Sequence, residues 1–154
     1  MSCSKYKLAR AAALLLAVTL SCQMKVETGS YPEQKALALA ALDTFHARFA
    51  AADYEAIWAD STDGFRSHPK DELIAQMKDT AARWGKPGKA HVMATSCFPK
   101  QVRLLVEAEF EKGSVGEVLV WNIDGQRALL HQIQWFAGPV RFPDGATNEC
   151  RSPG

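Results

Sequence analysis

The apolar residues of this chain change their spacing once, near Gly88, and that change constrains the fold more than any other feature of the sequence. Before Gly88 they recur every three or four positions, which predicts helices. After it they alternate with polar residues, which predicts strands. Helices followed by an antiparallel sheet are typical of the α+β class. The sequence therefore predicts N-terminal helices packed on an antiparallel sheet of four strands.

Three helices are expected, over residues 31–52, 53–63 and 69–84. The first carries an apolar stripe formed by Leu39, Leu42, Phe45 and Phe49. Asp53 can cap the second helix, in which Tyr54 and Trp58 share a face. Asp63-Gly64 is expected to end this short helix, and Gly85 is expected to end the third.

Four strands are expected, over residues 90–98, 101–111, 115–123 and 126–136. The turns between them are placed at Pro99-Lys100, Lys112-Gly113-Ser114 and Asp124-Gly125. A two-residue Asp124-Gly125 turn would pair Ile123 with Gln126. In this register the face toward the helices is apolar except for three polar side chains, those of Asn122, Arg127 and His131.

The same register sends the strand glutamates, Glu107, Glu109 and Glu117, to the outer face of the sheet. That arrangement is preferred because burying an unpaired carboxylate is costly. His131 is then the one titratable residue in the middle of the inward face. No inward carboxylate is expected.

The first 21 residues have the three parts of a secretory signal peptide. Lys5, Lys7 and Arg10 form the positive region, residues 11–20 the apolar region, and Ser21 the small residue before cleavage. A helix of this apolar run would rise only about 15 Å, half the thickness of the hydrocarbon core. It is therefore not expected to span a membrane.

The run Val18-Thr19-Leu20-Ser21-Cys22 resembles the bacterial lipobox, although its leucine lies one place nearer to the cysteine than is usual. The resemblance implies cleavage before Cys22, a diacylglycerol on its sulfur and often a third acyl chain on its amine, such as palmitate. Gln23 implies an outer-membrane location facing the periplasm, because lipoproteins of the inner membrane usually carry aspartate there. Residues 22–30 would form a lipidated tether. The alternative is ordinary cleavage, with Cys22 a free or paired thiol.

Two of the four cysteines remain in the folded part of the mature chain. Cys3 leaves with the signal peptide and Cys22 carries the lipid, so Cys97 and Cys150 form an even pair in an oxidising compartment. We expect a structural disulfide between them. A redox or metal role has less support, because neither cysteine belongs to a CxxC motif.

Removal of the signal peptide leaves 133 residues with 15 basic and 17 acidic side chains, whereas the whole chain of 154 has a formal charge of +1. This length suits one domain, expected over residues 31–136, followed by an irregular tail over residues 137–154. No Lys/Arg cluster remains after processing, which excludes nucleic-acid binding as a function class.

A long helix, a short helix that begins Asp-Tyr, a third helix that ends in Trp84-Gly85 and then four strands resemble the nuclear-transport-factor-2-like superfamily of α+β domains. In particular, the chain resembles small exported bacterial domains of unknown function. The segment 51–58 (AADYEAIW) carries the resemblance together with Trp84-Gly85, and it covers about residues 32–136. The resemblance implies a curved, cone-shaped sheet. In enzymes of this fold, the pocket between sheet and helices holds an inward Asp, His or Tyr as acid or base.

No nucleotide-binding, nucleophile-elbow or zinc-binding motif occurs in the sequence, so neither a cofactor nor a metal is expected. The candidate ligand pocket is formed by His131, Asn122, Tyr54 and Trp58. Here Asn122 could donate a hydrogen bond to an oxyanion beside His131. The alternative is that His131 is a core residue bonded to a helix carbonyl, and that Tyr54 and Trp58 are core packing.

Two function classes therefore remain. The first is a non-catalytic envelope protein, held on the membrane by its lipid, that binds a small apolar ligand or a protein partner. The second is a hydratase- or isomerase-type enzyme that uses the same pocket. The expected absence of an inward carboxylate favours the binding module.

Overall fold

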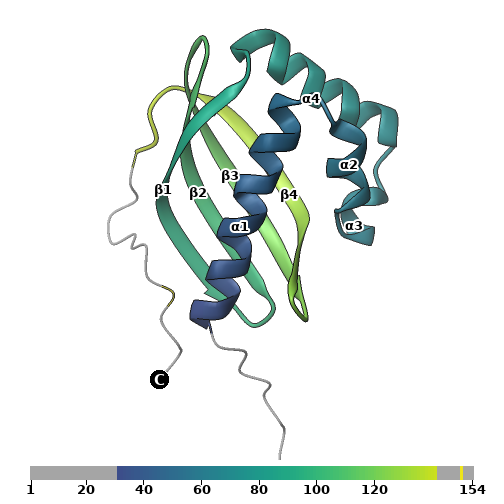
Figure 1. Ribbon diagram of the computed structural model, residues 1–154, viewed down its shortest axis with the longest axis vertical. Coiled ribbons are helices and arrows are strands. Elements are labelled where there is room, and N and C mark those ends of the chain that lie inside the picture. The colour runs from purple at the N-terminus through teal and green to yellow at the C-terminus, as the bar shows by residue number, and fades with distance from the viewer. Residues whose placement is uncertain (1–30, 142–149, 151–154) are drawn as a thin grey trace, which may run out of the picture.

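The computed structural model describes residues 31–141 and Cys150, and it has the predicted α+β architecture (Figure 1). Four helices come first: α1 (Tyr31–Ala50), α2 (Tyr54–Ala59), α3 (Asp63–Arg66) and α4 (Lys70–Trp84). Four strands follow: β1 (Pro87–Phe98), β2 (Gln101–Phe110), β3 (Gly113–Asp124) and β4 (Arg127–Ala137). They pair antiparallel in chain order.

Several predictions fall on parts of the chain outside the described residues. These are the signal peptide over residues 1–21, the lipidation site Cys22, the tether over residues 22–30 and most of the tail over residues 137–154. Of that predicted tail, Ala137 belongs to β4. Among the residues described, no helix is both long enough and apolar enough to cross a membrane.

Helix α1 lies across the sheet and contacts all four strands (Figure 1). The predicted apolar stripe is confirmed at three of its four positions, because Leu42, Phe45 and Phe49 are buried and Leu39 is only partly buried. Ala38 occupies the buried place one residue earlier. The main core therefore lies between α1 and the sheet.

The cap of α2 is confirmed, since the Asp53 carboxylate accepts a hydrogen bond from the Ala56 N–H at 3.3 Å. The prediction that Asp63-Gly64 ends the short helix is wrong. These residues begin α3, whose cap is Thr62, with Oγ1 accepting from the Phe65 N–H at 3.1 Å. Aspartate is favourable there because the N-terminus of a helix attracts negative charge. Helix α4 ends before Gly85, as predicted.

Two of the three predicted turns are displaced. The turn at Pro99-Lys100 is confirmed. Strands β2 and β3 are joined by Glu111 and Lys112, because Phe110 pairs directly with Gly113. Strands β3 and β4 are joined by Gly125 and Gln126. Both observed turns have two residues, which suits tightly paired antiparallel strands.

The displaced β2–β3 turn inverts the predicted face of β3. Leu104 pairs with Leu119 and Val106 pairs with Glu117, so the inward side chains are Val115, Glu117, Leu119, Trp121 and Ile123. Glu107 and Glu109 face outward as predicted, but Glu117 is fully buried. The predicted register was wrong because it treated every buried carboxylate as unpaired, and Glu117 has two partners.

Strand β4 contains a β-bulge at His131. Leu130 pairs with Trp121 and Gln132 pairs with Val120, so His131 has no partner in the ladder. Before the bulge the core side chains are those of Ala128 and Leu130, and after it they are those of Ile133 and Trp135. Leu129 lies two positions from both Arg127 and His131, so the predicted register also turned it toward the helices, and this expectation is wrong.

The sheet is curved, and its pairing is irregular in β1 and β4 (Figure 1). Two shifts in pairing occur in β1, between Pro87 and Ala90 and between Val92 and Ala94. Extra residues of this kind bend a strand and increase its twist. Cys97, in β1, forms the predicted disulfide with Cys150, with the two Cα atoms 5.3 Å apart.

Candidate functional site

A cleft of about 240 Å³ opens between α1, the end of α2 and the hairpin of β3 and β4. Its floor consists of four buried apolar side chains, those of Phe45, Ile57, Trp121 and Leu130. Ala40 and Ala41 form part of the α1 wall, and their small side chains leave room beside the floor. We call this space the α1–hairpin cleft.

Three charged residues at the rim of the cleft form one cluster: Arg48, Asp60 and Arg127. Arg48 Nη1 lies 2.7 Å from Asp60 Oδ2, and Arg127 Nη2 lies 3.0 Å from Asp60 Oδ1. Each carboxylate oxygen therefore accepts from a different arginine. With two guanidinium groups and one carboxylate, the charged residues that line the cleft sum to one positive charge.

The three rim residues come from three elements whose ends meet. Arg48 lies in the last turn of α1, Asp60 is the C-cap of α2, and Arg127 is the first residue of β4. The backbone of α2 is tied to β4 just beyond Asp60, where the Thr62 N–H donates to the Leu130 carbonyl at 2.9 Å. Ser61 also forms an isolated parallel bridge with Leu130. These backbone bonds hold the floor and the rim in a fixed relation.

Trp121 contributes an unused donor to the floor. Its side chain is 3% exposed, and among the described residues its Nε1–H has no hydrogen-bond partner. The same holds for the indole nitrogen of Trp58. Buried donors normally have partners. The floor is therefore apolar in area but holds one N–H donor without a partner among the described residues.

A second polar group lies in the core, around Glu117. One carboxylate oxygen lies 2.7 Å from His46 Nε2, and the other accepts a hydrogen bond from Trp135 Nε1 at 3.0 Å. Glu117 is fully buried and His46 is 8% exposed. The group joins α1 to β3 and β4, and both of its carboxylate oxygens are satisfied.

A carboxylate beside an imidazole can exchange a proton, so Glu117 and His46 form an acid–base couple. Neither residue lines the α1–hairpin cleft. The couple instead connects helix α1, which carries His46, to strand β3, which carries Glu117. The expectation that no carboxylate faces the helices was wrong, because it depended on the inverted register of β3.

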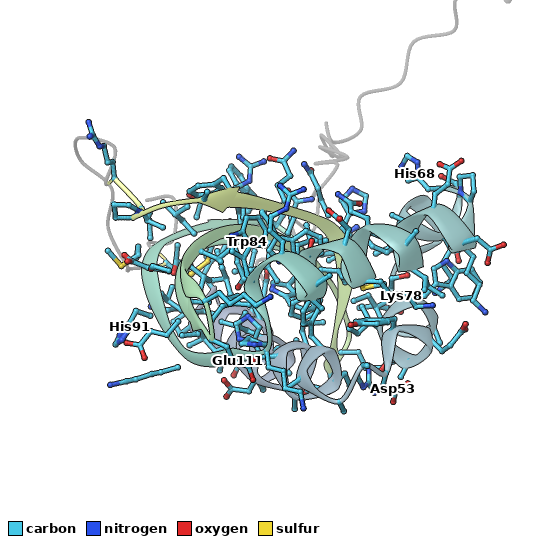
Figure 2. All side chains as sticks on the ribbon, turned by 90° about the horizontal axis from the view of Figure 1, so that it is seen from above. Asp53, His68, Lys78, Trp84, His91 and Glu111 are labelled. Carbon is cyan, nitrogen blue, oxygen red and sulfur yellow. A yellow bond between two sulfur atoms is a disulfide. The ribbon has the colours of Figure 1, made fainter. Side chains whose placement is uncertain are left out.

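His131 borders a different hollow, of about 310 Å³, between α3, α4 and β4. Its Nδ1 lies 3.1 Å from Thr62 Oγ1, the same oxygen that caps α3. The partner is thus a capping hydroxyl, where a helix carbonyl was the expected alternative. His68 also lines this hollow. Figure 2 shows His68 beside the first turn of α4, whereas Trp84 lies at the other end of this helix, near Glu111.

The other predicted pocket residues are dispersed. Asn122 lies on the outer face, where its side chain accepts a hydrogen bond from Gln101 Nε2 at 3.1 Å. Tyr54 packs edge-on against Phe49 at 5.5 Å between ring centroids, and burial raises the pKa of its hydroxyl. Trp58 is partly buried and lies under the Lys70 ammonium at 4.9 Å. The structure does not bring these three together with His131, and none of the four lines the cleft.

Sequence reasoning missed most of the residues that build the cleft. Arg127 was singled out as an inward polar residue, but Arg48, Asp60 and Trp121 were not. The helical spacing of Ala41, Phe45 and Arg48 is a signal that could have found one wall of the cleft, because residues three or four apart share a helix face. Asp60 carries no such signal, since its position depends on how α2 meets β4.

Within residues 31–141 and Cys150, no three His, Cys, Asp or Glu side chains are grouped so that they could hold a metal ion. Comparison with family models, with curated proteins and with solved structures finds no match for this chain. The chemistry of its own residues is therefore the basis for a functional interpretation.

Proposed function

We propose that this protein is a lipid-anchored component of the cell envelope whose folded domain binds a small apolar ligand in the α1–hairpin cleft. The main support is the floor of Phe45, Ile57, Trp121 and Leu130, which is mostly apolar, buried and bordered by an open space of about 240 Å³. Ligand sites in proteins are typically concave and mostly apolar, with a few polar groups. Covering such a floor stabilises a complex by about 25 cal/mol per Å² of apolar surface removed from water.

Filling the cleft tests this function directly. In the purified full chain, Ala41→Phe places a ring in the space that a ligand would occupy, so binding of 1-octanol should weaken at least about tenfold in calorimetric titration. Ala36→Phe is the matched control, because Ala36 is an exposed residue of α1 that does not line the cleft. If wild-type protein does not bind 1-octanol, or if both variants bind it equally well, the cleft is not a ligand site.

The anchor is proposed from the lipobox-like run that ends at Cys22. Cys22→Ala should leave an uncleaved precursor in the cell and abolish labelling with radioactive palmitate, because the acylated sulfur is gone. Cys3→Ala is the matched control, since Cys3 belongs to the signal peptide and its loss should leave labelling unchanged. Normal labelling of the Cys22→Ala protein would contradict the proposal.

We also propose that the fold belongs to the nuclear-transport-factor-2-like superfamily. Its support is the order of elements, together with a curved four-stranded sheet that has α1 across it (Figure 1). An experimentally determined structure tests this assignment. A sheet that is flat, or α1 on its convex face, would contradict it.

The buried couple of Glu117 and His46 favours one alternative, a hydratase- or isomerase-type enzyme. Such an enzyme needs a positioned acid or base, and this couple supplies one between α1 and the sheet, outside the α1–hairpin cleft. Deuterium exchange into the α-position of cyclohexanone, followed by NMR, probes this reactivity with a simple ketone. The alternative expects exchange above the buffer rate that is lost in Glu117→Gln. Exchange at the buffer rate in the wild-type protein counts against it.

A further inference from the structure

The rim of the α1–hairpin cleft has an excess of positive charge directly above an apolar floor. Arg48 and Arg127 share the carboxylate of Asp60, and no other charged residue of the described part of the chain lines the cleft. The side chains of Arg48, Asp60 and Arg127 are 31%, 47% and 65% exposed, so they are reached from solvent but partly shielded by the protein. Partial shielding strengthens an ionic contact relative to one on an open surface.

Both arginines keep guanidinium donors that no described residue engages. Arg48 uses Nη1 for Asp60 and for the Ala56 carbonyl, at 2.7 and 3.3 Å, while Arg127 uses Nη2 for Asp60. Among the described residues, the remaining guanidinium nitrogens of the pair have no hydrogen-bond partner. A planar guanidinium group presents its donors as a fork that matches the two oxygens of a carboxylate.

Asp60 determines how much charge the rim can accept. It holds two cations close together, which would otherwise repel each other, and it neutralises one of them. One positive charge remains, which matches a monoanion better than a dianion. An oxyanion at the rim would therefore complete the cluster without displacing Asp60 from either arginine.

The volume of the cleft limits the ligand further. A cavity of about 150 Å³ is enough for benzene, so a cleft of about 240 Å³ suits a molecule of about ten non-hydrogen atoms. A ligand of that size can cover the floor only if most of it is hydrocarbon, because Phe45, Ile57 and Leu130 offer no hydrogen bond there.

We propose that the ligand is a small monocarboxylate with a hydrocarbon tail, which rests on the cleft being the ligand site proposed above. The tail covers the apolar floor, and the carboxylate binds the free donors of Arg48 and Arg127. The expected ligand is thus a short-chain or medium-chain fatty acid, or an aromatic acid of similar size.

Octanoate and 1-octanol separate this inference from the proposed function, because they share a hydrocarbon chain and differ in charge. In calorimetric titration of the full chain at low salt, octanoate should bind about tenfold more tightly than 1-octanol, since a charge-assisted contact replaces a neutral one. The advantage should shrink as salt is raised to about 1 M, which screens the rim.

Arg127→Gln is the decisive variant, because this side chain is largely exposed and its one hydrogen bond goes to Asp60. It should reduce the preference for octanoate over 1-octanol, measured in the same variant, from about tenfold to about one. Arg83→Gln is the matched control: its side chain is 62% exposed, it pairs with Asp79 on α4, and it removes the same charge away from the cleft. Circular dichroism melts of both variants confirm that they remain folded.

Each outcome of these titrations has one reading. If 1-octanol binds and octanoate binds no better, the cleft is a ligand site but the carboxylate inference is wrong. If neither binds, the proposed function fails, and the inference fails with it. If acetate binds as tightly as octanoate, the rim is an ion site to which the floor contributes nothing. If Arg127→Gln leaves octanoate binding unchanged, the carboxylate is not recognised by this cluster.

Discussion

Glu117 is an acidic side chain in the middle of a hydrophobic core, and its stability there depends on two partners. His46 and Trp135 together satisfy both carboxylate oxygens, at 2.7 and 3.0 Å. Removing one member of such a group leaves a buried polar atom without a partner, which usually costs more than the group contributes when intact. The network therefore makes three positions on α1, β3 and β4 depend on one another.

Glu117→Ala should lower the free energy of unfolding by about 3–5 kcal/mol, because it leaves a cavity and unpairs His46 and Trp135. Urea unfolding followed by circular dichroism measures the change. Glu109→Ala is the matched control on β2: its side chain is 66% exposed, and the substitution should stay within about 0.5 kcal/mol of wild type. A loss of less than about 1 kcal/mol for Glu117→Ala would show that the pair contributes little.

Individual residues of the core were predictable where apolar and polar side chains alternate regularly along a strand. The inward side chains of β2, such as Leu104 and Val106, follow from simple alternation. Glu117 did not, because a rule against burying carboxylates holds only for unpaired ones, and His46 lies 71 residues away in the sequence. The cluster of Arg48, Asp60 and Arg127 was hidden for the same reason. Its members meet only through the tertiary fold.

The junction between α4 and β1 requires a glycine. Gly85 has a φ of +84°, and a Cβ atom added there would overlap the side chain of Glu111. Gly125, in the turn between β3 and β4, also has a positive φ of +59°, but a Cβ atom there would meet nothing within 4 Å. A substitution at Gly125 therefore measures backbone strain alone, whereas one at Gly85 measures backbone strain and steric overlap together.

Gly125→Ala should destabilise the protein by about 1–2 kcal/mol through backbone strain alone. Gly85→Ala should cost more than Gly125→Ala, because Glu111 must also move. Thermal unfolding of the two variants side by side provides the comparison. Equal losses would mean that the Glu111 side chain moves away at no cost, and a smaller loss at Gly85 would contradict the described geometry.

The existence and order of the long helices and strands were predictable, because apolar periodicity is a local property of the chain. The turns were less so. Moving the β2–β3 turn from Lys112-Gly113-Ser114 to Glu111 and Lys112 was enough to exchange the two faces of β3. Helix α3 was missed because its four residues are too few to show a period.

The disulfide between Cys97 and Cys150 links β1 to a residue 53 positions further along the chain. The covalent loop includes β2, β3 and β4, whereas all four helices lie outside it in the sequence. A loop of that length restricts the unfolded chain by ~4 kcal/mol in the loop-entropy model.

Replacing both cysteines, as in Cys97→Ser with Cys150→Ser, should lower the free energy of unfolding by an amount approaching that value. The urea midpoint of the wild-type protein should fall on addition of reductant, and that of the double variant should not change. Free-thiol titration of the unfolded, unreduced wild-type protein should find neither Cys97 nor Cys150 reactive. Two reactive thiols in protein taken from the cell envelope would contradict the bond.

The bulge at His131 lets β4 supply two parts of the core that would otherwise require different registers. Ala128 and Leu130 serve the α1–hairpin cleft from one side of the extra residue, and Trp135 serves Glu117 from the other. Leu130 and Ile133 both face the core although they are three positions apart, so deleting His131 would restore plain alternation and keep both halves of β4 facing inward. Deleting Leu129 would instead place Leu130 opposite Asn122, on the outer face, and the cleft would lose part of its floor. The tolerance of β4 to the loss of one residue should therefore depend on which side of the bulge the residue is taken from.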